Sequence, residues 1–171
     1  MNIDKENLAF IPALELSKAI ARKEISSEEV TLAALDRAEL TQDSLNAFIT
    51  ICRDQAVEEA VKADSEVSDS AKLSPLHGVP LTVKDLINTA GVRTTMGSRI
   101  FDENFTGSDA VAIERLKNAG AVLIGKTTTP EFGHKPYTSA PIFGQTVNAW
   151  DQNRIAGGSS GGAAVAAAAG L

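Results

Sequence analysis

A lysine that follows a short apolar run is the first side chain that could do chemistry. Lys84 comes directly after Val79-Pro-Leu-Thr-Val83, a run typical of a buried strand. Burial disfavours the ammonium form, so it lowers the pKa of a lysine and can leave a neutral amine near pH 7. A neutral amine can act as a general base. Position alone favours a simpler alternative, an exposed lysine at a strand end that pairs with the adjacent Asp85.

A glycine- and serine-rich segment is the second candidate. The segment Gly157-Gly-Ser-Ser-Gly-Gly162 has few side chains to obstruct a sharp backbone path, and it leads into an alanine-rich stretch at 163–170. A loop that opens a helix directs backbone N–H groups toward developing negative charge. On composition alone, a flexible linker is an equally good interpretation. The alanine-rich stretch is nearly uncharged and predicts a helix buried on most sides, which argues against a linker.

A third segment imitates a nucleotide-binding loop. Residues 120–127 read Gly-Ala-Val-Leu-Ile-Gly-Lys-Thr, which satisfies the spacing of a phosphate-binding P-loop. A P-loop needs a strand before the motif and a helix beginning at its Lys-Thr pair. Here residues 121–124 are themselves the predicted strand, and Pro130 follows too closely for a helix. The sequence therefore argues against nucleotide hydrolysis.

Several segments together resemble the amidase-signature family. The resemblance rests on residues 78–85 (Gly-Val-Pro-Leu-Thr-Val-Lys-Asp), 125–132 (Gly-Lys-Thr-Thr-Thr-Pro-Glu-Phe) and 157–162, supported by 25–30, 45–48, 91–95 and 143–148 in the expected order. It covers nearly the whole chain. Each piece alone is common, and their order and spacing are what make them specific. Ala149 and Ala156 stand where the family usually has proline, so the entry to the Gly-Ser loop is expected to be less rigid here.

The resemblance implies an α/β fold, namely the N-terminal portion of the family's α/β/α architecture with a mixed central sheet. It also implies an amidase that hydrolyses a carboxylic amide to the acid and ammonia or an amine. Lys84 and Ser159 match two members of the family's Ser–cis-Ser–Lys proton relay. The reaction that this relay serves passes through an acyl-enzyme. The Gly158–Ser159 peptide bond is accordingly expected to be cis. The family's nucleophilic serine lies some two dozen residues after the position of Ser159, beyond Leu171, so these 171 residues alone are expected to be inactive.

The neighbours of these two residues take supporting roles by the same resemblance. Gly157 and Gly158 are expected to shape the loop, and Ser160 to form hydrogen bonds within the site. Gly133 falls where the family often lines the acyl pocket, although a simple turn glycine is an equally good interpretation.

Two rival functions stay open. The amidase-signature subunit of a glutamyl/aspartyl-tRNA amidotransferase belongs to the same family and works with partner subunits and RNA. The Thr-Pro-Glu-Phe segment at 129–132 favours a stand-alone amidase, because the amidotransferase subunit more typically has Met-Asp-Glu-Phe there. The other rival is a non-catalytic, truncated family member that keeps the fold without the chemistry.

The elements that must position these residues fall into two regions. All 13 glycines lie at or after Gly78, which predicts a helical lead-in over 1–77 and the start of a catalytic core over 78–171, both within one amidase domain. The lead-in predicts helices from Pro12 to Lys23, over 27–40 after a Ser26–Glu29 capping box, and over 53–64. A strand is predicted at 45–51 and an acidic loop at 65–74. The core predicts strands at 79–83 and 121–124 around a helix at 109–119.

Composition excludes several other classes. A net charge of −6 and the absence of a basic run argue against nucleic-acid binding, and no apolar run approaches the length of a membrane span. The polar N-terminus predicts a cytoplasmic protein. Cys52 cannot form an intramolecular disulfide and reads as a buried structural thiol, and His77 and His134 read as structural or exposed. We therefore expect no metal or other cofactor and a small-molecule amide substrate, and a homodimer of the full-length protein stays open.

Overall fold

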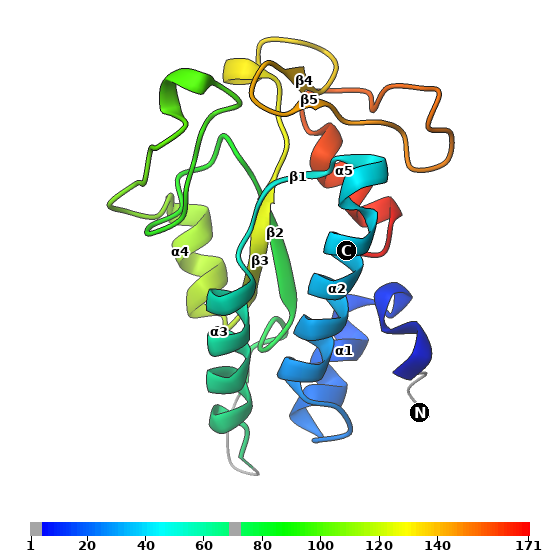
Figure 1. The fold of residues 1–171 in the computed structure, drawn as a ribbon. Helices are drawn as coiled ribbons and strands as arrows, with labels where there is room; N and C mark the ends of the chain where they lie inside the picture. Colours follow the sequence, from blue (N-terminus) through cyan, green and yellow to red (C-terminus); the bar gives the residue numbers. More distant parts are fainter. Residues whose placement is uncertain (1–4, 69–72) are drawn as a thin grey trace.

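The computed structural model describes residues 5–68 and 73–171 of the chain. The structure alternates helices and strands, as an α/β fold requires (Figure 1). In chain order the α-helices and strands are α1 (Ala13–Ala21), α2 (Ser27–Leu45), β1 (Phe48–Ile51), α3 (Arg53–Glu66), β2 (Pro80–Lys84), α4 (Val111–Asn118), β3 (Val122–Thr127), β4 (Ser139–Ala140), β5 (Gly144–Gln145) and α5 (Gly161–Ala168). Short 3₁₀ turns occupy Lys5–Phe10 (η1), Arg99–Phe101 (η2) and Glu131–Gly133 (η3).

The principal sheet is mixed, as predicted. Its strand order is β1-β3-β2, with β1 antiparallel and β2 parallel to the central strand β3. The parallel pair is joined through α4, which is the crossover that parallel strands need. Lys84 is paired with Thr127, so the last residues of β2 and β3 lie at the same edge of the sheet.

Helices cover both faces of this sheet. Successive side chains of a strand point to opposite faces, and β3 follows this rule. Val122 and Ile124 belong to a core shared with α2, α3 and α5, whereas Leu123 packs with Ile113 of α4 on the other face. Figure 1 shows α4 on one side of β2 and β3 and α2 on the other. The α/β/α layering expected from the sequence is therefore present in this chain.

The helical lead-in largely matches its prediction. Ser26 Oγ accepts from the Glu29 N–H (2.9 Å), and the Glu29 carboxylate accepts from the Ser26 N–H (2.9 Å), so the capping box is confirmed. Helix α2 extends past the predicted end at residue 40 to Leu45, because Leu45 is buried and Asn46 caps the helix in the left-handed conformation (φ 50°). The strand predicted at 45–51 consequently begins only at Phe48.

Other boundaries shift by one to three residues. Strand β3 continues through Gly125, Lys126 and Thr127, all buried, beyond the predicted end at residue 124. Helix α5 begins at Gly161 rather than 163, and its Ala164 and Ala167 are exposed, so the expected burial on most sides is only partly met. The predicted loop at 65–74 starts after α3 ends at Glu66, and its residues 69–72 lie outside the described part of the chain.

Candidate active site

Lys84 and Ser159 lie in direct contact although 75 positions separate them in the sequence. The Lys84 Nζ donates to the Ser159 Oγ at 2.9 Å and to the Ser160 Oγ at 3.0 Å. Both distances are in the normal range for a hydrogen bond. The structure thus brings together the three side chains that the sequence singled out for the site.

Two elements set this contact. Lys84 is the last residue of β2, and the next backbone N–H, that of Asp85, donates to the Thr127 carbonyl and continues the pairing with β3. Ser159 lies in the loop that enters α5, and α5 packs against β2 and β3. A Cβ at Gly162 would lie 2.5 Å from the Thr128 backbone nitrogen, so only glycine allows the start of α5 to approach the sheet this closely.

The electrostatic setting of Lys84 suits a base. Burial lowers the pKa of the Lys84 ammonium below its usual value. The alternative pairing with Asp85 does not form, because the Asp85 side chain accepts from the Thr95 N–H (3.0 Å) and hydroxyl (2.5 Å). Partial desolvation therefore makes the Lys84 proton easier to lose, and the Ser159 and Ser160 hydroxyl groups lie in position to exchange a proton with the amine.

The expected cis bond is absent, which is a correction to the sequence-based prediction. Peptide bonds among the described residues are trans, including Gly158–Ser159. A non-proline cis bond costs about 3–4 kcal/mol and persists only where surrounding contacts enforce it. Here Gly158 makes the turn with a positive φ of 73° and a trans bond, and in the described part of the chain no atom beyond its neighbours in sequence lies within 4 Å of its Cβ position.

The remaining predicted residues lie in the loop that carries Ser159 and in η3. Gly157 forms an isolated bridge with Tyr137, and the Gly158 N–H donates to the Pro136 carbonyl at 2.8 Å. The Gly161 N–H, one of the amides expected to face developing charge, instead donates to the Thr138 hydroxyl at 2.9 Å. Gly133 lies in η3, where its Cβ position faces Leu86, two residues after Lys84. Its role in binding substrate stays a prediction.

The part of the P-loop-like segment 120–127 that forms β3 is buried inside the sheet. Lys126 has no exposed side-chain surface and lies within β3, and no helix begins at the Lys126-Thr127 pair. The argument against a phosphate-binding loop is thereby confirmed. Sequence reasoning missed what Lys126 does instead, which is to approach the buried Asp85 at 3.8 Å. A lysine inside an apolar strand was the available signal.

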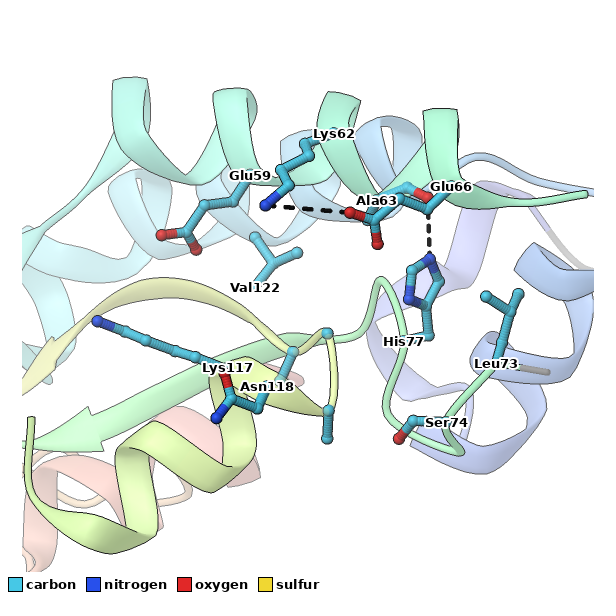
Figure 2. A pocket seen from close by; sticks show the side chains of 13 residues that line it. Glu59, Lys62, Ala63, Glu66, Leu73, Ser74, His77, Lys117, Asn118 and Val122 are labelled. Carbon is cyan, nitrogen blue, oxygen red and sulfur yellow. Dashed lines mark hydrogen bonds and ion pairs between the residues drawn. The ribbon is translucent and has the colours of Figure 1, made fainter. Parts of the chain in front are cut away.

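A cavity of about 590 Å³ lies at the other end of the parallel strands (Figure 2). It is bordered by α3, by His77 and by the turn that leads from α4 into β3. Five of its polar side chains already have partners within the chain: Lys62 and Glu66 pair with each other (3.9 Å), Lys117 with Asp109 (3.0 Å), Glu59 with the Leu123 N–H (3.1 Å), and His77 Nε2 with the Ala63 carbonyl (2.8 Å). The cavity therefore offers few free groups for chemistry.

The described residues include no group of three or more His, Cys, Asp or Glu side chains that could hold a metal ion. Cys52 is half-buried beside the apolar cluster that includes Leu123, and burial raises the pKa of its thiol to about 11. In the same part of the chain, no helix is both long and apolar enough to cross a membrane.

Comparison with known proteins agrees with this geometry. The profile of the family described as Amidase matches residues 29–171, well over half of the chain. The chain belongs to the amidase family. This membership confirms the resemblance drawn from the motifs, and the mixed sheet with helices on both faces agrees with it.

The relatives of this amidase-family chain include both amidotransferase subunits and amidases. It is 45% identical over 163 residues to a glutamyl-tRNA(Gln) amidotransferase subunit of Moorella thermoacetica, covering 95% of this chain and 34% of the relative. It is 38% identical over 167 residues to an acylamidase of Rhodococcus erythropolis, covering 98% and 35%. The solved peptide amidase of Stenotrophomonas maltophilia superposes with a TM-score of 0.86 at 34% identity, covering 94% and 34%. The chain thus spans about a third of the length of these relatives.

Proposed function

We propose that the protein is an amidase that hydrolyses a carboxylic amide to the acid and ammonia or an amine, with Lys84 and Ser159 as two members of its proton relay. One observation carries this proposal: the 2.9 Å contact between the Lys84 Nζ and the Ser159 Oγ, at a lysine whose pKa burial lowers. The acylamidase and the peptide amidase among the relatives support the reaction class.

The proposed chemistry uses the neutral amine. With Lys84 deprotonated, the contact runs in the opposite direction, and the Ser159 hydroxyl donates to the Nζ. As a nucleophilic serine attacks the amide carbon, its proton passes to the Ser159 Oγ while the Ser159 proton passes to Lys84. The C–N bond then breaks as the leaving nitrogen takes a proton back through the relay, and water cleaves the resulting ester.

The nucleophile is not assigned to any residue of this chain. By family resemblance it is a serine beyond Leu171, so the proposal concerns the full-length protein that contains this sequence. Ser160 is proposed to share the Lys84 ammonium through its 3.0 Å hydrogen bond, and Gly133 to border the acyl group. The trans Gly158–Ser159 bond departs from the family relay, so the proposal stands on the Lys84–Ser159 contact.

The test is an assay of the full-length protein on simple aliphatic and aryl amides, alongside Lys84→Ala and Ser159→Ala. Loss of a proton-transfer group costs about 10²–10⁴-fold in rate. We expect both variants to lose at least about 100-fold in kcat while retaining the wild-type unfolding transition. Unimpaired turnover by both variants would contradict the relay.

A second candidate function is that of the amidase-signature subunit in a glutamyl-tRNA amidotransferase. The 45% identity to the Moorella protein favours it. One pair of assays distinguishes the two functions. A stand-alone amidase hydrolyses simple amides by itself. The amidotransferase component would act only when partner subunits and charged tRNA are added. Inactivity in both assays would leave the non-catalytic alternative.

A further inference from the structure

The buried hydroxyl of Thr138 bridges the two ends of the loop that carries Ser159. The Thr138 Oγ1 donates to the Gly158 carbonyl at 2.9 Å and accepts from the Gly161 N–H at 2.9 Å. The residues between these two contacts are Ser159 and Ser160, the hydrogen-bond partners of Lys84. Thr138 itself has no exposed surface, and its contact with the Gly161 N–H is buried, so water does not compete for that contact.

The fit between Thr138 and the loop is close. A Cβ at Gly161 would lie 2.4 Å from the Thr138 Oγ1 and 2.8 Å from its Cβ, so this approach requires glycine. The chain on either side of Thr138 runs beside the loop, through the Tyr137–Gly157 bridge and the bond from the Gly158 N–H to the Pro136 carbonyl. Thr138 therefore lies in the middle of the contact between residues 136–138 and the loop at 157–161.

Side-chain packing contributes little to holding the first half of the loop. Apart from their own chain neighbours, no atom of the described residues lies within 4 Å of the Cβ positions of Gly157 or Gly158. Glycine loses more conformational freedom on ordering than any other residue, so such a segment stays fixed only where hydrogen bonds hold it. Beyond Thr138, the Ser159 carbonyl accepts a longer bond of 3.3 Å from the Thr129 hydroxyl.

We propose that Thr138 is a positioning residue for the relay: its hydroxyl fixes the Gly158–Gly161 loop and thereby holds the Ser159 Oγ against the Lys84 Nζ. The inference rests on the proposed amidase function. Thr138 itself does not touch the reacting atoms. It acts through Ser159, because a displacement of about 1 Å in a reacting group can cost about 100-fold in rate.

The first experiment compares Thr138→Val and Thr138→Ser in the full-length protein. Valine keeps the size and loses the hydroxyl, whereas serine keeps the hydroxyl. We expect Thr138→Val to lower kcat about 10–100-fold with KM within about threefold, and Thr138→Ser to retain kcat within about threefold. Equal losses in both variants would assign the effect to packing and overturn the proposal.

Thr146→Val is the matched control. Thr146 is equally buried, and its hydroxyl bonds to the Asn46 carbonyl (2.7 Å) and to the Thr128 hydroxyl (2.7 Å) rather than to the loop that carries Ser159. The chemical change is the same, so a general loss of stability affects both valine variants. We expect Thr146→Val to keep the wild-type kcat.

Amide hydrogen exchange supplies a readout that does not need activity. The Gly161 N–H is held by the Thr138 hydroxyl, so its exchange should rise about tenfold or more in Thr138→Val and stay unchanged in Thr146→Val. Unchanged Gly161 exchange, or an unchanged kcat where Lys84→Ala is inactive, would overturn the proposal. If the wild-type protein cleaves no amide, the proposed function fails, and the exchange result still decides whether Thr138 holds the loop.

Discussion

Lys126 and Asp85 face each other in the interior, with the Lys126 Nζ 3.8 Å from the Asp85 Oδ1 and no exposed surface on either side chain. Among the described residues, that oxygen has no hydrogen-bond partner. The Lys126 ammonium donates to three oxygens of the segment after Lys84: Ile87 O (2.8 Å), Thr89 Oγ1 (3.1 Å) and Thr94 Oγ1 (2.7 Å). Burial lowers the pKa of Lys126 to about 8 and raises the pKa of Asp85.

Removing one member of this pair should destabilise the fold strongly. Lys126→Met leaves Asp85 buried without a cation, which costs about 3–5 kcal/mol in comparable pairs. Adding Asp85→Asn removes the stranded charge and should recover part of that loss. Urea unfolding at pH 7 measures both variants. Lys62→Met is the control, because Lys62 is 78% exposed and lies 3.9 Å from Glu66, so its unfolding free energy should change by less than about 0.5 kcal/mol. A wild-type stability for Lys126→Met would contradict this role.

The pH dependence of amide hydrolysis should report the protonation of Lys84. The relay needs the neutral amine, so kcat/KM should rise with pH as Lys84 loses its proton. Because burial lowers the pKa of Lys84 from 10.5, the midpoint of this rise should fall below 10.5. Initial rates of the full-length protein at low substrate, from pH 6 to pH 10, measure it. A kcat/KM that falls over this range while the protein stays folded would rule out Lys84 as the base.

Close packing of α5 on the sheet predicts a large effect at Gly162. A Cβ there would meet backbone atoms, the Thr128 nitrogen at 2.5 Å and the Ala47 carbonyl oxygen at 2.7 Å, which cannot rotate away. Gly162→Ala should therefore cost about 1–3 kcal/mol, despite the better helix propensity of alanine. Thermal unfolding checks it. Gly107→Ala serves as the matched variant and should be nearly neutral, because its φ is not positive and no atom of the described residues beyond its chain neighbours lies within 4 Å of its Cβ position.

The capping box predicts a smaller and local effect. Ser26→Ala removes the hydroxyl that accepts from the Glu29 N–H and should destabilise α2 by about 0.5–2 kcal/mol. Ser44→Ala is the comparison, since the Ser44 hydroxyl bonds back to the Thr41 carbonyl of the same helix at an exposed position. Chemical denaturation of both variants measures the difference, and equal stabilities would show that the cap contributes nothing.

The sequence predicted the helices and strands well where contacts between residues close in sequence determine them. The Ser26–Glu29 box marks the start of α2 within four residues, so periodicity and capping were sufficient. The end of α2 was less predictable, because the burial of Leu45 and the bond from the Gln42 side chain to the Phe48 carbonyl (2.8 Å) depend on the packed β1 strand. Element boundaries that depend on tertiary packing were therefore not predicted from the sequence.

The sequence by itself determined the family, the position of Lys84 at the end of a strand and the glycine-rich loop around Ser159, because spacing and residue type carry that information. Only the tertiary structure decided that Lys84 reaches Ser159 across 75 positions, that the Gly158–Ser159 bond is trans, and that Lys126 pairs with Asp85. These features depend on how α5 and β3 pack around β2. Packing selects among the many partners that a polar side chain could find, and a linear pattern does not rank them.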